Sequence, residues 1–154
     1  MIFAFGLRLH HIGYAVAEIP PASALYTARF GYEIVSPVIH DPLQTAHVQF
    51  LRLPGDSSYL EFVAPDGPDS KLSAAVQKGG GLNHLCFHSG PLEAMIEHLE
   101  ANGLLLISDP KPAVAFAGRR ICWLMGRDRL PIELVERRSD SDLCEPGIDS
   151  APGT

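Results

Sequence analysis

The chain has 154 residues, of which 46% are hydrophobic and 19% charged, so it is long enough to bury the core of one globular domain. Its formal net charge of −6 argues against a general affinity for nucleic acid, which needs a basic surface. No apolar run approaches the roughly 20 residues of a transmembrane helix, so no membrane contact is expected. Residues 1–7 lack the basic start of a signal peptide, and the three cysteines have no framework spacing. We therefore expect reduced thiols and a cytoplasmic protein.

The first half of the chain is typical of a strand, a helix and three further strands. Residues 9–16 form an apolar strand, and Pro20-Pro21 then offers a helix start, because proline is tolerated in the first helical turn. Apolar residues at helical spacing continue to Phe30, and Gly31 ends the helix. Three strand-like runs follow, at residues 32–38, 46–53 and 58–64.

The second half repeats this order. A strand at residues 83–88 leads to a helix at residues 92–101, which Asn102-Gly103 ends. Three further strands are expected at residues 104–108, 120–125 and 130–136. A short helix at residues 69–78 and three consecutive glycines join the two halves, and the glycines predict a flexible hinge.

The two halves also share two sequence motifs at matching positions. Leu9-His10-His11-Ile12-Gly13 returns as Leu82-Asn83-His84-Leu85, and Tyr59-Leu60-Glu61-Phe62-Val63 returns as Pro131-Ile132-Glu133-Leu134-Val135. Glu61 follows His11 by 50 positions, and Glu133 follows His84 by 49. The chain is therefore interpreted as one module built twice, at about residues 9–66 and 82–137.

Two copies are too few for a solenoid, so we expect two small curved sheets that meet pseudo-symmetrically around a cleft. Together they make a single domain of residues 1–138. Residues 139–154 are rich in serine, proline, glycine and acidic side chains, and we expect them to be a flexible tail.

The shared motifs predict a metal site. A histidine or glutamate inside an apolar strand is costly unless something pairs it, and a divalent cation at the seam of the modules would do so. Because strand side chains alternate, we expect His10 and His11 to point to opposite faces. The repeat aligns His11 with His84 and His10 with Asn83. The expected ligands are therefore His11, Glu61, His84 and Glu133, a set that suits Zn, Co, Ni, Mn or Fe and leaves two positions open if octahedral.

These motifs resemble the vicinal oxygen chelate superfamily, which includes glyoxalases, bleomycin-resistance proteins and dioxygenases. The resemblance covers about residues 9–137, and within the superfamily the sequence is most similar to the methylmalonyl-CoA epimerase group. Five segments carry the resemblance. They are Leu9-His10-His11-Ile12-Gly13, Leu60-Glu61-Phe62-Val63-Ala64-Pro65, Gly80-Gly81-Leu82-Asn83-His84-Leu85, Asp109-Pro110-Lys111-Pro112 and Ile132-Glu133-Leu134-Val135-Glu136. The resemblance implies an α+β fold of two tandem βαβββ modules in a pseudo-twofold, incompletely closed eight-stranded barrel around a metal cleft.

The resemblance also implies a metal-dependent isomerase, epimerase or lyase that forms an enolate on a small acyl-CoA or similar thioester. The metal stabilises the enolate, and protein bases, Glu133 among them, move the proton. In the epimerases a second base is an acid on the third strand of the first module. In this chain Gln49 most nearly occupies the position of that acid. Because an amide is a poor base, His47 on the same strand is the alternative candidate.

Other residues have two interpretations each. Arg119 and Arg120 are candidates for binding the phosphates of a thioester or for solvated surface charge, and Phe116 and Trp123 for lining a pocket or packing in the core. The alternative functions are a glyoxalase-type lyase, an Fe(II) oxygenase, which the fourth ligand Glu61 disfavours, and a metabolite- or drug-binding protein without catalysis. The resemblance implies a homodimer.

Overall fold

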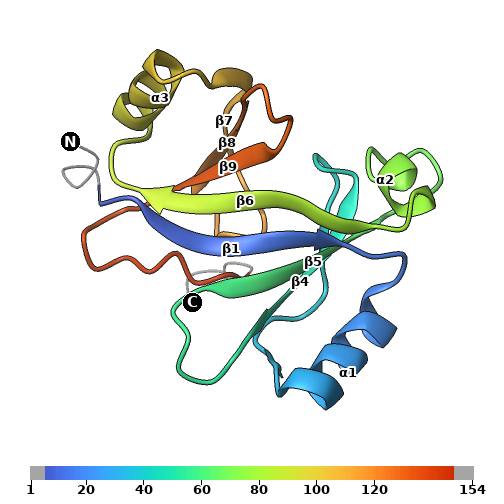
Figure 1. The fold of residues 1–154 in the computed structure, drawn as a ribbon. Coiled ribbons are helices and arrows are strands. Elements are labelled where there is room, and N and C mark those ends of the chain that lie inside the picture. Colours follow the sequence, from blue (N-terminus) through green and yellow to red (C-terminus); the bar gives the residue numbers. More distant parts are fainter. Residues whose placement is uncertain (1–5, 148–154) are drawn as a thin grey trace, which may run out of the picture.

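The computed structural model describes residues 6–147, in which nine strands form one curved, mixed sheet that does not close (Figure 1). Three helices accompany the sheet. The elements in chain order are β1 (Arg8–Ala15), α1 (Ile19–Phe30), β2 (Glu33–Ile34), β3 (Ile39–Asp41), β4 (Ala46–Arg52), β5 (Tyr59–Pro65), α2 (Ser73–Gln77), β6 (Gly81–Ser89), α3 (Leu92–Ala101), β7 (Leu105–Pro112), β8 (Arg120–Met125) and β9 (Pro131–Glu136).

The strand order confirms the α+β class and the two βαβββ modules. The sheet runs β2-β4-β5-β1-β6-β9-β8-β7, so each module contributes four neighbouring strands in equivalent order. β1 is parallel to β5 and β6 is parallel to β9, while β1 and β6 pair antiparallel at the seam between the modules. The short strand β3 is an addition to this scheme and pairs with β4.

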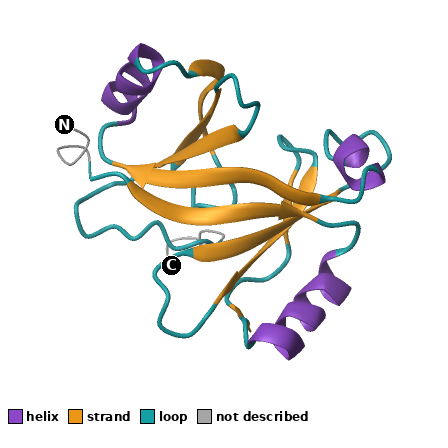
Figure 2. Ribbon diagram, in the orientation of Figure 1, coloured by secondary structure: helices purple, strands orange, loops and turns teal. Residues whose placement is uncertain are grey.

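The two longer helices lie on the outside of the sheet, one on each module (Figure 2). α1 begins with Pro20 and Pro21 in its first turn and ends at Gly31, whose positive φ of 79° is the left-handed cap that glycine adopts most readily. Its Ile19 packs with apolar residues of β4 and β5. α3 likewise buries Leu92 and Met95 against β8 and β9. Burial of these apolar faces fixes each helix on its own module.

The inner surface of the sheet holds a core that both modules share. Phe50 of β4 and Phe116, between β7 and β8, meet there edge to face with ring centroids 5.7 Å apart. β7 continues beyond its expected end at residue 108 to Pro112. β7 lies at the edge of the sheet, so one of its sides has no partner strand. Pro110 and Pro112, which have no N–H group to donate, are tolerated in such an edge strand.

Residues 139–147, which the composition predicted to be flexible, form a strap that packs against the inside of the barrel. We call this segment the C-terminal strap. Asp142 accepts two hydrogen bonds of 2.8 Å from the guanidinium of Arg119, and Cys144 is fully buried. Gly147 pairs with Phe116 as an isolated bridge. Figure 1 shows the strap running beside β1. The remainder of the expected tail, residues 148–154, lies outside the described residues.

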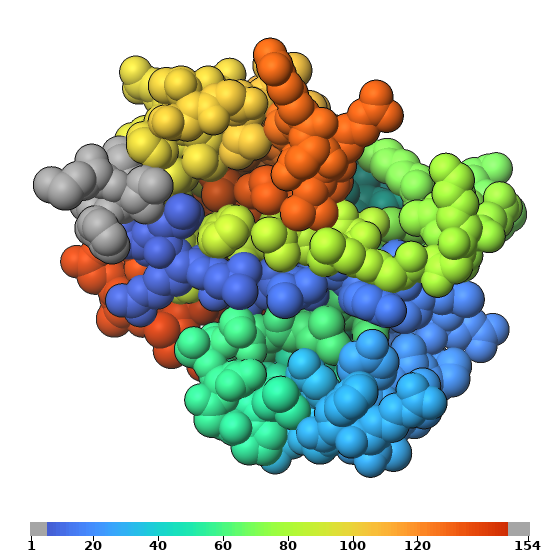
Figure 3. Space-filling view, in the orientation of Figure 1, coloured from blue at the N-terminus to red at the C-terminus, as the bar shows by residue number. Residues whose placement is uncertain are grey.

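No helix in the described part of the chain covers the outer face of the seam. Figure 3 shows β1 and β6 at the surface, between the parts of the molecule that α1 and α3 cover. Leu9, Ile12 and Leu82 are exposed there. Within residues 6–147, none of the helices is both long and apolar enough to cross a bilayer.

Candidate metal centre

Four side chains from the four central strands meet on the inner surface of the seam. His11 of β1 and His84 of β6 face each other with their Nε2 atoms 3.0 Å apart. Glu61 Oε1 of β5 lies 3.4 Å from Nε2 of His11 and 3.2 Å from Nε2 of His84. Glu133 Oε1 of β9 lies 3.3 and 3.9 Å from the same two atoms. All four residues are buried, so the structure brings together every residue that the repeat predicted as a ligand.

This donor set fits a divalent cation. Ligand atoms about 2.1 Å from one ion lie about 3 Å from their neighbours in an octahedral arrangement, close to the 3.0–3.4 Å that separates three of these atoms here. Glu133 Oε1 is also buried and makes no hydrogen bond. Two imidazoles and two carboxylates suit a borderline first-row metal. The residues present therefore fit the metal that the sequence predicted.

His10 does not point away from His11, contrary to the expected alternation. Leu9 pairs with Phe87 and His11 with Cys86, so His10 is an unpaired extra residue, a β-bulge in β1. A bulge lets two consecutive side chains face the same side of a sheet. His10 and His11 are therefore both buried inside the barrel, with 1% and 0% of their surfaces exposed.

The charges around the site shift the titration of its histidines. Burial alone would lower the pKa of His11, but the carboxylates of Glu61 and Glu133 outweigh burial and raise it to about 9. Burial, with the charge of His11 beside it, lowers the pKa of His10 to about 3. Glu61 is buried too, yet His11 and His84 hold its pKa well below the usual range. In the metal-free site a proton on His11 therefore partly balances the carboxylates.

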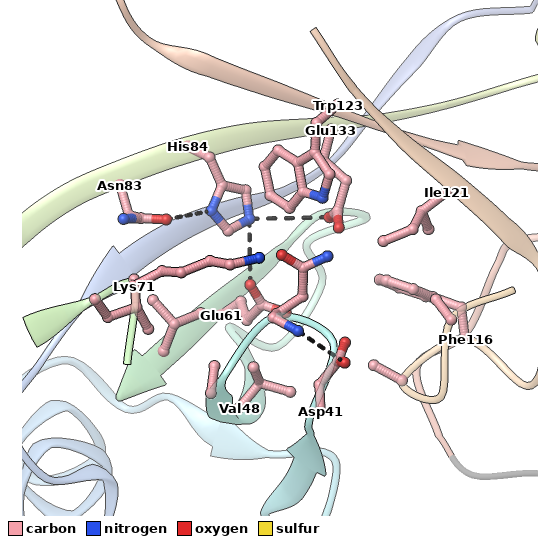
Figure 4. Close-up of a pocket in the computed structure, with 16 residues that line it drawn as sticks. Asp41, Val48, Glu61, Lys71, Asn83, His84, Phe116, Ile121, Trp123 and Glu133 are labelled. Carbon is pink, nitrogen blue, oxygen red and sulfur yellow. Dashed lines mark hydrogen bonds and ion pairs between the residues drawn. The ribbon is translucent and has the colours of Figure 1, made fainter. Parts of the chain in front are cut away.

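Three of the four residues line a pocket (Figure 4), and His11 lies fully buried behind them. The inner cavity, of about 100 Å³, is lined by Glu61, His84 and Glu133. It continues into an outer groove of about 520 Å³, with which it shares Asp41 and Trp123 among other residues. The indole N–H of Trp123 is buried without a hydrogen-bond partner.

Asp41 is a functional candidate that the sequence analysis missed. It ends β3, is buried, and lines the pocket without belonging to the metal set. Its Oδ1 accepts hydrogen bonds from the backbone N–H groups of Leu43 and Gln44, at 3.1 and 3.3 Å. Burial raises the pKa of its carboxyl. A proline follows Asp41, a pattern typical of a turn. Nothing in the repeat marks Asp41, because β3 has no counterpart in the second module.

Gln49 and His47 lie outside the pocket. Gln49 accepts a hydrogen bond from Ser23 Oγ of α1 at 2.7 Å and donates one to the carbonyl oxygen of Ser36 at 3.2 Å. The His47 ring lies against that of His40 with centroids 4.8 Å apart. β4 alternates regularly, so Val48 faces the pocket and its two neighbours face outward. The inward position on this strand is thus apolar.

Of the four residues expected to bind substrate, two line the pocket. Phe116 and Trp123 do so, and Trp123 packs edge to face on His84 with centroids 4.9 Å apart. Arg119 holds the C-terminal strap through Asp142, and Arg120 pairs with Glu93 and Glu136 on the outer side of the sheet. The cations that line the outer groove are instead lysines, Lys71 and Lys111.

Comparisons with known proteins identify the family of the chain and agree with its fold. Residues 10–123 match the model of the Glyoxalase/Bleomycin resistance protein/Dioxygenase superfamily. The ethylmalonyl-CoA/methylmalonyl-CoA epimerase of Cereibacter sphaeroides is 26% identical over 123 residues, which cover 79% of this chain and 90% of that protein. The mitochondrial methylmalonyl-CoA epimerase of Mus musculus is 28% identical over 123 residues, which cover 79% of this chain and 67% of that protein. The crystal structure of methylmalonyl-CoA epimerase from Mycobacterium tuberculosis superimposes with a TM-score of 0.69 at 26% identity, covering 83% of this chain and 86% of that one.

Proposed function

This chain belongs to the Glyoxalase/Bleomycin resistance protein/Dioxygenase superfamily, and we propose that within it the chain is a metal-dependent epimerase that acts by enolate formation on a small coenzyme A thioester. The observation that carries the proposal is the set of two histidines and two glutamates with nitrogen–oxygen separations of 3.2–3.9 Å at the base of an open pocket. The relatives whose names specify epimerases of ethylmalonyl-CoA and methylmalonyl-CoA support the choice of substrate class.

The chemistry needs a proton to leave a carbon next to a carbonyl. A divalent ion held by His11, Glu61, His84 and Glu133 would supply Lewis-acid stabilisation of the negative charge that develops, a contribution of several kcal/mol. The inner wall around Phe116 and Val48 is apolar, and an apolar wall lowers the local dielectric and so strengthens electrostatic interactions in the cavity. The unpartnered indole N–H of Trp123 is a donor available to a substrate oxygen.

An epimerase must take a proton from one face of the carbon and return one to the other. Figure 4 shows the carboxyl groups of Glu133 and Asp41 on opposite sides of the pocket. We assign the two proton transfers to this pair, with Asp41 in the role that the sequence had suggested for Gln49 or His47. Burial raises the pKa of Asp41, which makes its carboxylate a stronger base than an exposed aspartate.

The outer groove would hold the rest of the thioester. Lys71 and Lys111 line it, and their ammonium groups suit the phosphates of coenzyme A. Lys71 Nζ donates a hydrogen bond to the carbonyl oxygen of Leu43, which also lines the outer groove, at 3.3 Å. We do not assign this role to Arg119 and Arg120, because their guanidinium groups pair with Asp142, Glu93 and Glu136.

The test combines metal analysis with isotope exchange. Purified protein is expected to bind one divalent ion per chain and to incorporate deuterium from D₂O at the α-carbon of methylmalonyl-CoA. Both properties should be lost in His11→Ala, while Glu97→Gln, which alters an exposed glutamate of α3, should retain them. Exchange no faster than in protein-free buffer would reject the epimerase assignment.

Two other candidates follow from the same site. The apolar inner face of β4, where Val48 and Ala46 line the pocket, favours a protein that binds a metabolite without catalysis. A metal-loaded wild type that binds the thioester but does not exchange its proton would support that alternative. A glyoxalase-type lyase would instead convert the hemithioacetal of methylglyoxal and glutathione, and the same preparation should be assayed with it.

We further propose that the enzyme is a cytoplasmic homodimer. The exposed side chains of Leu9, Ile12 and Leu82 on the uncovered outer face of β1 and β6 support a contact between two copies. The three cysteines, all buried as free thiols, support a reducing compartment. Light scattering of wild type and Leu82→Lys tests the dimer, which the lysine should weaken; a monomeric wild type would contradict it.

A further inference from the structure

Each of the two metal histidines follows a β-bulge. In β1 the unpaired residue is His10, directly before His11. In β6 it is Asn83, directly before His84, because Gly13 pairs with His84 while Tyr14 pairs with Leu82. His10 and Asn83 occupy equivalent positions in the two modules. A bulge turns the side chain of the extra residue toward the side that the next residue faces, so both residues reach the rear of the adjacent imidazole.

The two bulge residues contact the ring nitrogens that face away from the site. The Nδ1 atoms of His10 and His11 are 2.7 Å apart, and Asn83 Oδ1 is 2.8 Å from Nδ1 of His84. A histidine can bind a metal only through a nitrogen without hydrogen. If Nε2 of His11 and of His84 are ligands, each neutral ring must therefore carry its hydrogen on Nδ1 and donate it to the bulge residue.

In the first module the chain of hydrogen bonds continues to the C-terminal strap. His10 accepts from His11 at Nδ1, so its own hydrogen lies on Nε2, which donates to the carbonyl oxygen of Cys144 at 2.8 Å. A carbonyl oxygen can only accept, so this contact fixes the tautomer of His10. The strap is held there by Asp142, which accepts hydrogen bonds from Arg119 and from the backbone N–H groups of Arg138 and Cys144.

We propose that His10 and Asn83 are positioning residues that hold His11 and His84 in the metal-binding tautomer, and that the C-terminal strap controls the affinity of the metal site through His10. The inference rests on the metal site of the proposed function, but it concerns binding and not turnover. It also gives residues 139–147 a role that their composition does not suggest.

The first experiment measures binding of Co²⁺ and Zn²⁺ to the full chain. Groups that orient metal ligands typically contribute ten- to hundredfold in metal affinity, so His10→Leu is expected to weaken binding by about that factor. His10→Asn supplies at this position the same acceptor that Asn83 supplies in the second module, and it should bind within about threefold of wild type. Equal affinity of His10→Leu and wild type, or equal loss in both variants, would overturn the role of His10.

The second module offers the same comparison. Asn83→Leu should weaken binding, whereas Asn83→Asp keeps an acceptor for His84 and should bind at least as tightly as wild type. Circular dichroism and urea unfolding of every variant separate a loss of affinity from a loss of fold. A folded Asn83→Leu with wild-type affinity would limit the positioning role to the first module and contradict the proposal for Asn83.

The link to the strap is tested by a double-mutant cycle. Asp142→Ala removes the acceptor that anchors the strap but contacts none of the four ligands in the hydrogen bonds described. It should weaken Co²⁺ binding in the wild-type background and add little to His10→Leu, because both changes break one chain of contacts. Equal effects of Asp142→Ala in the two backgrounds would show that the strap does not act through His10.

A separate readout distinguishes the inference from the proposed function. ¹⁵N spectra of the metal-free protein at pH 10 report which ring nitrogen carries the hydrogen. Nδ1–H tautomers of His11 and His84 in wild type, and their loss in His10→Leu and Asn83→Leu respectively, would support the positioning role even if no Co²⁺ bound. Absence of Co²⁺ binding by wild type would overturn the metal site, and Nε2–H tautomers in wild type would overturn the inference itself.

Discussion

Gly13 of β1 and His84 of β6 are partners across the seam between the modules, and the imidazole of His84 occupies the space where a side chain of residue 13 would lie. A Cβ atom at position 13 would overlap Cε1, Nδ1 and Nε2 of that ring. The backbone of Gly13 is not in the left-handed region, so the residue is needed for close approach and not for its conformational freedom. The position of His84, one of the four proposed metal ligands, therefore depends on the absence of a side chain on the neighbouring strand.

We expect Gly13→Ala to abolish or strongly weaken metal binding. The added methyl group must displace the ring of His84 and with it Nε2, which lies 3.0 Å from Nε2 of His11. Gly67→Ala is the matched control, because a Cβ atom there meets nothing within 4 Å and Gly67 also has no positive φ. Calorimetric titration with Zn²⁺ measures the effect. Wild-type affinity in Gly13→Ala would mean that His84 is not a ligand in its observed position.

Metal should stabilise the folded chain. A ligand that binds only the native state at 100 times its Kd adds about 2.7 kcal/mol to the free energy of unfolding, which for a domain of this size is a rise in Tm of roughly 5–10 °C. Differential scanning fluorimetry with Zn²⁺ and with a chelator checks this. His11→Ala should show no difference between the two conditions. A similar rise in that variant would place the metal at another site.

The pH dependence has a definite sign. His11 has a folded-state pKa of about 9, raised from 6.5 because the carboxylates of Glu61 and Glu133 outweigh its burial. Protonated His11 therefore stabilises the metal-free fold fully below pH 6.5, and this contribution is lost as the pH rises from 6.5 to 9. Since a metal must displace the same proton, its apparent affinity should rise up to about tenfold per pH unit over that window.

Two series of measurements check these opposite trends. The Tm of the metal-free protein should fall between pH 6.5 and 9, and the Kd for chelator-buffered Zn²⁺ should decrease over the same range. His11→Phe keeps a ring of similar shape and should remove most of the fall in Tm. A metal affinity that does not change with pH would show that His11 carries no proton in the metal-free site.

Gln49 is expected to matter for stability and not for catalysis. Its amide is hydrogen-bonded to Ser23 Oγ and to the carbonyl oxygen of Ser36. Gln49→Leu leaves both partners unsatisfied in a buried environment, which should cost about 1–3 kcal/mol in the free energy of unfolding. Urea unfolding measures the cost, and deuterium exchange at saturating metal should be unchanged. A variant of normal stability that no longer exchanges would restore Gln49 to the active site.

The sequence repeat was sufficient to predict the modules and the four residues that meet at the seam, because equivalent strands carry equivalent side chains. It could not predict the bulges. Alternation assigned His10 to the outer face, and the extra residue that reverses this is visible only once Leu9 and His11 are paired with β6. The burial of Cys144 was also hidden, since it depends on an ion pair between Arg119 and Asp142, 23 residues apart in the chain. Local pattern carries no information on such long-range contacts.

Asp41→Asn tests the assignment of the second proton-transfer group. The amide oxygen can still accept the N–H groups of Leu43 and Gln44, so the turn after β3 should persist. A positioned base contributes on the order of 10²–10⁴-fold, and deuterium exchange into methylmalonyl-CoA should fall by about that factor while Zn²⁺ affinity is unchanged. Asp66→Asn is the control, because Asp66 pairs with His40 outside the pocket. Exchange at the wild-type rate in Asp41→Asn would assign the proton to another group, whereas loss of Zn²⁺ binding would show that Asp41 supports the metal site itself.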